Sequence, residues 1–121
     1  MKISISSQGA SPDSAVDPRF GRAAQFLIYD TDTDSYEVAS NSQSLDAAQG
    51  AGIKAAETIS KHGARVLITG HCGPKAFSTL KAAGIEVFTG AEGLSVSQAL
   101  NKYRSGQLNA THSSDVTGHW K

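Results

Sequence analysis

The sequence predicts a single α/β domain with a mixed, mostly parallel five-stranded sheet and helices on both faces. Short runs of alternating or β-branched residues, which are typical of strands, are followed by segments whose apolar residues recur at helical spacing. Two helix–glycine–strand units follow one another in the second half of the chain, as expected for right-handed crossovers between parallel strands. The length of 121 residues suits one domain. We place this domain at residues 1–108 and predict a flexible polar tail at residues 109–121.

The first forty residues predict three strands and one long loop. Residues 2–6 alternate isoleucine with polar side chains, as a strand with two different faces does. Residues 25–30 and 36–39 predict two more strands, and the Thr-Asp-Thr-Asp turn between them predicts an antiparallel hairpin. Residues 7–22 hold two prolines and two glycines, so we expect a loop there.

The rest of the chain predicts alternating helices and strands. A stripe of small residues that starts at Ala48 and reaches Ile59 predicts a helix that packs closely on the sheet and ends at Gly63. The elements expected after it are a strand at 66–69, a helix that begins at Pro74 and ends at Gly84, a strand at 85–88, and a helix with a capping box at Ser95 and Gln98. The predicted order is therefore β-β-β-α-β-α-β-α.

Composition narrows the classes of function. Eleven basic and eleven acidic residues give no net charge, which argues against a general nucleic-acid binder. The single cysteine excludes an internal disulfide. No apolar run reaches the roughly 20 residues that span a bilayer, and the first residues are too polar for a signal peptide. We therefore expect a cytoplasmic protein without a membrane or nucleic-acid partner.

Two loops are predicted to meet where the parallel strands end, because ligands of open α/β sheets bind beyond the carboxyl ends of such strands. The second loop opens a helix whose free N–H groups attract anions, and its glycines let a ligand approach the backbone. The predicted cofactor-binding residues are Arg19, Phe20, Gly21 and Arg22 in the first loop, and Gly70, His71, Cys72, Gly73, Pro74 and Lys75 in the second.

Each loop also has a simpler explanation. The arginines of the first loop could pair with a nearby aspartate while Phe20 fills the core. The Gly-x-x-Gly-Pro turn could merely join a strand to a helix. Cys72 and His71 are predicted to contact a metal, since thiolate is a soft ligand that suits copper and molybdenum–sulfur chemistry. A lone cysteine can equally be a small buried hydrophobe.

Three motifs together resemble a known family. The first lies at residues 17–30 around Phe20-Gly21-Arg22, the second reads Gly-Ala-Gly-Ile-Lys-Ala-Ala at residues 50–56, and the third lies at residues 70–85 around Gly73-Pro74-Lys75. In this order and spacing they resemble the dinitrogenase iron–molybdenum cofactor-binding family over residues 1–108. The resemblance implies a three-layer ribonuclease-H-like fold. It also implies a carrier, not an enzyme, for an anionic metal–sulfur cluster.

The resemblance further suggests a cargo. The chain is most similar to members of the family that hold a molybdenum–copper sulfide cluster without covalent bonds, and the iron–molybdenum cofactor or a precursor is the alternative. Some members have a histidine ligand where Arg19 stands. Arginine attracts an anion but does not ligate a metal, so this departure favours electrostatic capture.

Two other functions stay open. The first is a protein-interaction or regulatory module whose pocket gates the binding of a partner. The second is an enzyme that uses Cys72 as a nucleophile. The common nucleotide-binding enzymes are disfavoured, because the sequence contains neither a P-loop nor a G-x-G-x-x-G fingerprint.

Overall fold

The computed structural model describes residues 1–41 and 50–111, and it has the predicted α/β architecture. The predicted order β-β-β-α-β-α-β-α is confirmed. The elements are β1 (Lys2–Ser7), β2 (Gln25–Asp30), β3 (Ser35–Ser40), α2 (Ala51–Lys61), β4 (Ala64–Ile68), α3 (Pro74–Ala82), β5 (Glu86–Phe88) and α4 (Val96–Arg104). Ala48, where the predicted helical stripe starts, lies outside the described residues, as do residues 112–121 of the predicted tail.

The five strands form one mixed sheet in the order β3-β2-β1-β4-β5. Strands β1, β4 and β5 pair in parallel, whereas β2 is antiparallel to both β1 and β3. The β2–β3 hairpin therefore supplies the antiparallel edge, as predicted. Because β2 runs opposite to both of its neighbours, β3 runs in the same direction as β1. The carboxyl ends of β1, β3, β4 and β5 thus share one edge of the sheet.

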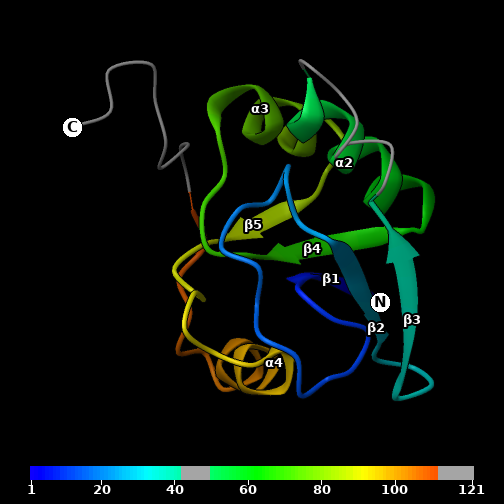
Figure 1. Ribbon diagram of the computed structural model, residues 1–121, viewed down its shortest axis with the longest axis vertical. Helices are drawn as coiled ribbons and strands as arrows, with labels where there is room; N and C mark the ends of the chain where they lie inside the picture. The colour runs from blue at the N-terminus through cyan, green and yellow to red at the C-terminus, as the bar shows by residue number, and fades with distance from the viewer. Residues whose placement is uncertain (42–49, 112–121) are drawn as a thin grey trace.

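Helices cover both faces of the sheet, with α2 and α3 on one side and α4 on the other (Figure 1). Each side encloses its own hydrophobic core. Strand β2 serves both, because its side chains alternate between the faces. Phe26 and Ile28 pack on the α2/α3 side, and Leu27 and Tyr29 pack on the α4 side. This explains why the four central residues of β2, 26–29, are hydrophobic on both faces.

The helix ends follow the sequence signals. Residues Gly63, Gly84 and Gly106 follow α2, α3 and α4 with φ angles of 81°, 77° and 76°, a left-handed conformation that glycine adopts without strain. At the start of α4, the Ser95 hydroxyl accepts a hydrogen bond from Gln98 N at 3.1 Å. In return, Ser95 N donates to Gln98 Oε1 at 2.9 Å. The predicted capping box is therefore confirmed.

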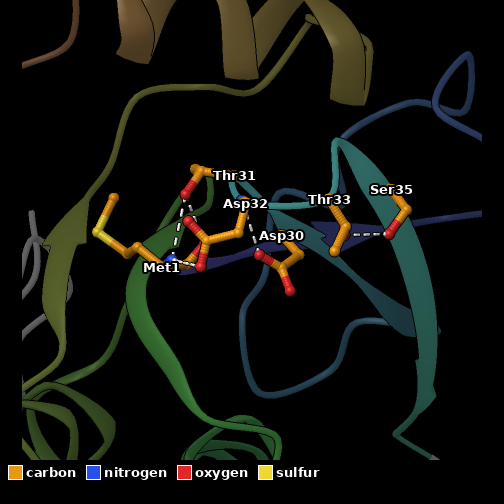
Figure 2. A network of polar contacts seen from close by, with 6 residues as sticks. All are labelled: Met1, Asp30, Thr31, Asp32, Thr33 and Ser35. Carbon is orange, nitrogen blue, oxygen red and sulfur yellow. Dashed lines mark hydrogen bonds and ion pairs between the residues drawn. The ribbon is translucent and has the colours of Figure 1, made fainter.

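The turn between β2 and β3 is tied to the start of β1 (Figure 2). The amino group of Met1 donates to the Thr31 hydroxyl at 3.1 Å and lies 3.4 Å from an Asp32 carboxylate oxygen. The Asp30 carboxylate accepts from Asp32 N at 2.9 Å. Since Asp30 pairs with Lys2 at the beginning of β1, these contacts fix the hairpin at the end of the sheet opposite the shared carboxyl edge.

The chain after α4 returns to the free edge of β5. Ala110 forms an antiparallel bridge with Phe88, and Thr111 N donates to Val87 O at 2.7 Å. The Thr111 hydroxyl lies 2.8 Å from the Thr89 hydroxyl. The sheet edge thus holds residues that the sequence assigned to the tail, while the domain boundary at residue 108 stays a prediction. Within residues 1–41 and 50–111, no helix combines the length and the apolar character needed to cross a bilayer.

Candidate functional site

The two predicted loops lie side by side where β1 and β4 end. Arg19 and His71 form an isolated parallel bridge. His71 N donates to Pro18 O at 2.7 Å, and Phe20 N donates to His71 O at 3.2 Å. A methyl group on Gly70 would lie 2.6 Å from Pro18 O, so only glycine permits this close approach. The predicted meeting of the arginine-bearing loop and the loop that starts α3 is confirmed.

Asp17 holds the first loop in shape. Its carboxylate oxygens accept hydrogen bonds from Arg19 N at 3.1 Å and from Ala24 N at 3.3 Å. The backbone oxygen of Asp17 accepts from the Ser6 hydroxyl at 2.7 Å. The side chain is only 7% exposed, so its charge is directed at the backbone of its own loop.

A hollow of about 340 Å³ lies beside this junction. Three segments line it, namely Gly21 and Arg22 of the first loop, residues 50–53 at the start of α2, and residues 73–76 at the start of α3. Arg22 and Lys75 are the charged side chains among the lining residues that the structure describes, and none of those residues carries a carboxylate. The first turns of both helices also lack acidic residues. The described part of the lining therefore carries a net positive charge.

Both helices begin at the hollow with a glycine N-cap. Gly50 precedes α2 and Gly73 precedes α3, and neither residue has a side chain that could cap the helix. The first helical hydrogen bonds run from Lys54 N to Gly50 O at 3.0 Å and from Phe77 N to Gly73 O at 2.9 Å. In each helix, the backbone N–H groups that come before Lys54 or Phe77 in the first turn have no acceptor within the helix. They add to the positive ends of two helix dipoles, an arrangement that binds anions.

Small residues bring these three segments together. A Cβ atom on Gly21 would lie 2.9 Å from Gly52 N, and one on Gly52 would lie 2.7 Å from the Ala76 methyl group. The buried Asn41 side chain donates to Ala23 O at 2.8 Å and to Gly21 O at 3.4 Å. Asn41 thus holds the carbonyl groups on both sides of Arg22, which fixes the backbone from which this side chain extends.

The structure divides the ten predicted site residues into two groups. Gly21, Arg22, Gly73, Pro74 and Lys75 line the hollow. The remaining five lie at or beneath the junction of the two loops: Arg19, Phe20, Gly70, His71 and Cys72. Among these, Arg19 is exposed and Gly70 is buried against Pro18.

Phe20, Cys72 and His71 are not among the described residues that line the hollow. The Phe20 ring is 1% exposed and packs against Phe26 with ring centroids 5.4 Å apart, which matches the alternative of a core residue. Cys72 is also 1% exposed, and its sulfur lies 3.7 Å from Gly73 O. His71 Nε2 lies 3.4 Å from a Glu92 carboxylate oxygen. Over the part of the chain that the structure describes, no cluster of three His, Cys, Asp or Glu residues could hold a metal ion.

The start of α2 is the part of the hollow that sequence reasoning missed. The prediction considered only the loops after the strands expected to be parallel, and it treated β3 as an antiparallel edge. Because β3 runs in the direction of β1, its carboxyl end lies at the same edge of the sheet. Gly50, which follows β3 in the sequence, lines the hollow. The available signal was the glycine-rich stretch at residues 50–53 directly before a helix.

Comparison with known proteins identifies the family of this chain. The family model described as dinitrogenase iron-molybdenum cofactor matches residues 1–106. The apo form of the orange protein from Desulfovibrio gigas is 43% identical, with a TM-score of 0.93 over 95% of this chain and 96% of that chain. A candidate NifB protein from Thermotoga is 35% identical, with a TM-score of 0.81 over 95% and 98%. An uncharacterized Methanocaldococcus jannaschii protein is 27% identical over 99 residues, which are 79% of this chain and 82% of its own. The chain belongs to the dinitrogenase iron–molybdenum cofactor family.

Proposed function

We propose that this protein is a non-catalytic carrier of an anionic molybdenum–copper sulfide cluster, which it holds without covalent bonds in the hollow between the starts of α2 and α3. The observation that carries the proposal is the convergence of two glycine-capped helix starts with Arg22 and Lys75 on one hollow whose described lining has no carboxylate. The cluster is the cargo, and its metals and sulfides bring their own colour and redox chemistry.

The residues of the hollow fit a large anion. The Arg22 guanidinium offers a planar fork of donors, and the Lys75 ammonium adds a compact positive charge. The backbone N–H groups of the first helical turns supply further donors. Four of the ten described lining residues are glycines and two are alanines, so small side chains leave room for a bulky ligand to reach these donors.

The lining also favours sulfide over oxide. Apart from the two cations, the lining residues that the structure describes are Gly, Ala, Ile and Pro. Moving a strongly hydrated oxyanion out of water against such walls is costly unless every oxygen finds a donor. A thiometallate spreads its charge over larger and more weakly hydrated sulfur atoms. This chemistry agrees with a molybdenum–sulfur cargo, which the family and the likeness to the orange protein support.

A carrier fits the placement of Cys72 better than an enzyme does. The thiol is 1% exposed inside the α2/α3-side core, whereas a nucleophile must reach a substrate. We retain Cys72 and His71 as predicted metal contacts. Either contact requires the side chain to turn from its present neighbours, which include Gly73 O for Cys72 and Glu92 for His71.

The proposal is tested by loading the apo-protein with tetrathiomolybdate and a copper salt under anaerobic conditions, followed by gel filtration and metal analysis. We expect a coloured species that elutes with the protein and contains both metals. The double variant Arg22→Ala with Lys75→Ala should lose most of this species, because the hollow loses both charges.

The matched control is Arg65→Ala with Lys102→Ala, which removes the same charge from exposed positions outside the hollow. This control should load normally. A wild-type protein that retains no colour, or a control that loads as poorly as the hollow variant, would contradict the proposal. Retention of molybdenum without copper would replace the proposed cargo with a copper-free one.

A further inference from the structure

We infer that Gly73 determines which ligands the hollow accepts, because its missing side chain leaves the start of α3 both uncapped and open. This inference rests on the proposed function. It assigns the selection of the cargo to one position, and it defines the accepted class as anions that bind the N–H groups of the first turn of α3.

Neither the backbone nor the packing requires glycine at position 73. The φ and ψ angles are −73° and 167°, which any residue adopts. A Cβ atom built on Gly73 would meet no atom of residues 1–41 and 50–111 within 4 Å. Gly70, three residues earlier, is different, because its Cβ atom would lie 2.7 Å from Pro18 Cα. A glycine that the fold does not require, placed in the wall of a binding hollow, calls for a functional reason.

The start of α4 shows what a side chain at position 73 would do. Ser95 precedes α4 with φ and ψ of −78° and 165°, nearly the same angles as Gly73. Its hydroxyl accepts a hydrogen bond from Gln98 N, three residues later, at 3.1 Å. By the same geometry, a serine in place of Gly73 would accept from Ala76 N.

Ala76 is itself a lining residue of the hollow. A capping hydroxyl at position 73 would therefore occupy a donor that the anion needs and would fill space at its side. Serine, threonine, aspartate and asparagine are the residues that stabilise helix starts best. Glycine at this position thus leaves α3 less stable than it could be and leaves its N–H groups to the ligand.

The experiment compares four single variants with the wild-type chain: Gly73→Ser, Gly73→Asp, Gly73→Ala and Ser95→Gly. Each is measured by thermal unfolding without ligand and by titration with tetrathiomolybdate plus copper. We expect Gly73→Ser to raise the melting temperature by about 3 °C and to weaken binding about tenfold. Gly73→Asp should weaken binding further, because its charge repels the anion.

The other two variants separate the causes. Gly73→Ala adds bulk without a capping oxygen, so it should weaken binding less than Gly73→Ser does. Ser95→Gly removes the cap of α4, so it should lower the melting temperature and leave the affinity unchanged. Gly73→Ser should therefore raise the melting temperature and lower the affinity, whereas Ser95→Gly should change only the melting temperature.

Wild-type affinity in Gly73→Ser would overturn the inference, as would a melting temperature for this variant that is no higher than that of the wild type. Both results leave the proposed function intact, provided that the wild-type chain binds the cluster. If the wild-type chain binds nothing, the proposed function fails, and the selective role of Gly73 fails with it.

Discussion

The starts of α3 and α4 have nearly identical backbone angles and opposite chemistry. At α4, Ser95 and Gln98 satisfy each other's backbone N–H groups. At α3, Gly73 offers no side chain, and the first turn opens onto a hollow with Arg22 and Lys75. A side chain caps α4, where only stability is at stake. No side chain caps α3, which begins at the proposed anion site. A local departure from good helix design therefore marks the candidate site.

The two sides of the sheet also differ in the residues that pack the helices against it. On the α4 side, aromatic rings fill the space, and Phe88 packs edge-on against Tyr103 at 4.9 Å. Arg104 donates to the Tyr29 hydroxyl at 3.1 Å, and this hydroxyl donates to Asp34, so α4 is joined to the hairpin. On the α2/α3 side, glycine and alanine allow close contact between the helices and the first loop. Aromatic rings thus dominate the helix contacts on the α4 side, and small residues dominate those between α2, α3 and the first loop.

The largest expected effect is on the free energy of unfolding, and it comes from removing a buried aromatic ring on either side of the sheet. Phe20→Ala and Phe88→Ala should each lower the free energy of unfolding by about 4 kcal/mol, because each removes a buried ring. Only Phe20→Ala should also weaken loading with the cluster, since Phe20 immediately precedes Gly21 and Arg22. Denaturant unfolding and the loading assay measure the two quantities.

Phe20→Leu, with an expected loss of about 1 kcal/mol, keeps the fold for the loading assay. If Phe20 were a wall of the hollow, this mild variant would load poorly although it is stable. Normal loading of Phe20→Leu supports the position of Phe20 in the core.

A smaller effect separates the two glycines of the third motif. Gly70→Ala should lower the free energy of unfolding by about 2 kcal/mol, because the new methyl group meets the Pro18 backbone. Gly73→Ala should change it by less than about 0.5 kcal/mol, because its methyl group meets no described residue within 4 Å. Equal losses in the two variants, measured by urea unfolding, would show that both glycines serve packing.

The smallest effect concerns the α4 side at alkaline pH. The hydrogen bond to Asp34 raises the pKa of Tyr29 above 10.0, and burial raises the pKa of Tyr36 and Tyr103. Above pH 10 the unfolded chain releases these protons before the folded chain does, so stability is complete below pH 10 and falls above it. Urea midpoints at about pH 8 and pH 10.5 measure this fall.

Tyr29→Phe provides the control for that measurement, because phenylalanine has no proton to release. The variant should show a smaller fall between the two pH values than the wild type. An equal fall in both proteins would assign the alkaline sensitivity to groups other than Tyr29.

The element order was predictable because each element carries a local signal. The alternation at residues 2–6, the turn at 31–34 and the capping box at Ser95 depend on near neighbours in the sequence, and the structure confirms all three. The meeting of the two loops was also predictable, since parallel strands deliver their connections to one edge. These features follow from chain geometry alone.

The lining of the hollow was only partly predictable, because side-chain direction depends on tertiary packing. Phe20 and Arg22 are two residues apart, yet one is buried in the core and the other lines the hollow. The contribution of residues 50–53 depends on the direction of β3, which the pairing of three strands sets. No single segment of the sequence contains that information.

Because Cys72 is buried, its reactivity reports local opening of the protein without an added label. It is the only cysteine of the protein and is 1% exposed beneath the start of α3. A thiol reagent can therefore react only when this region opens, and the reaction rate measures the opening equilibrium without any engineered label. Any compound that bridges the helix starts would slow this reaction. Alkylation kinetics could then rank unlabelled and colourless compounds by how firmly they close the molecule.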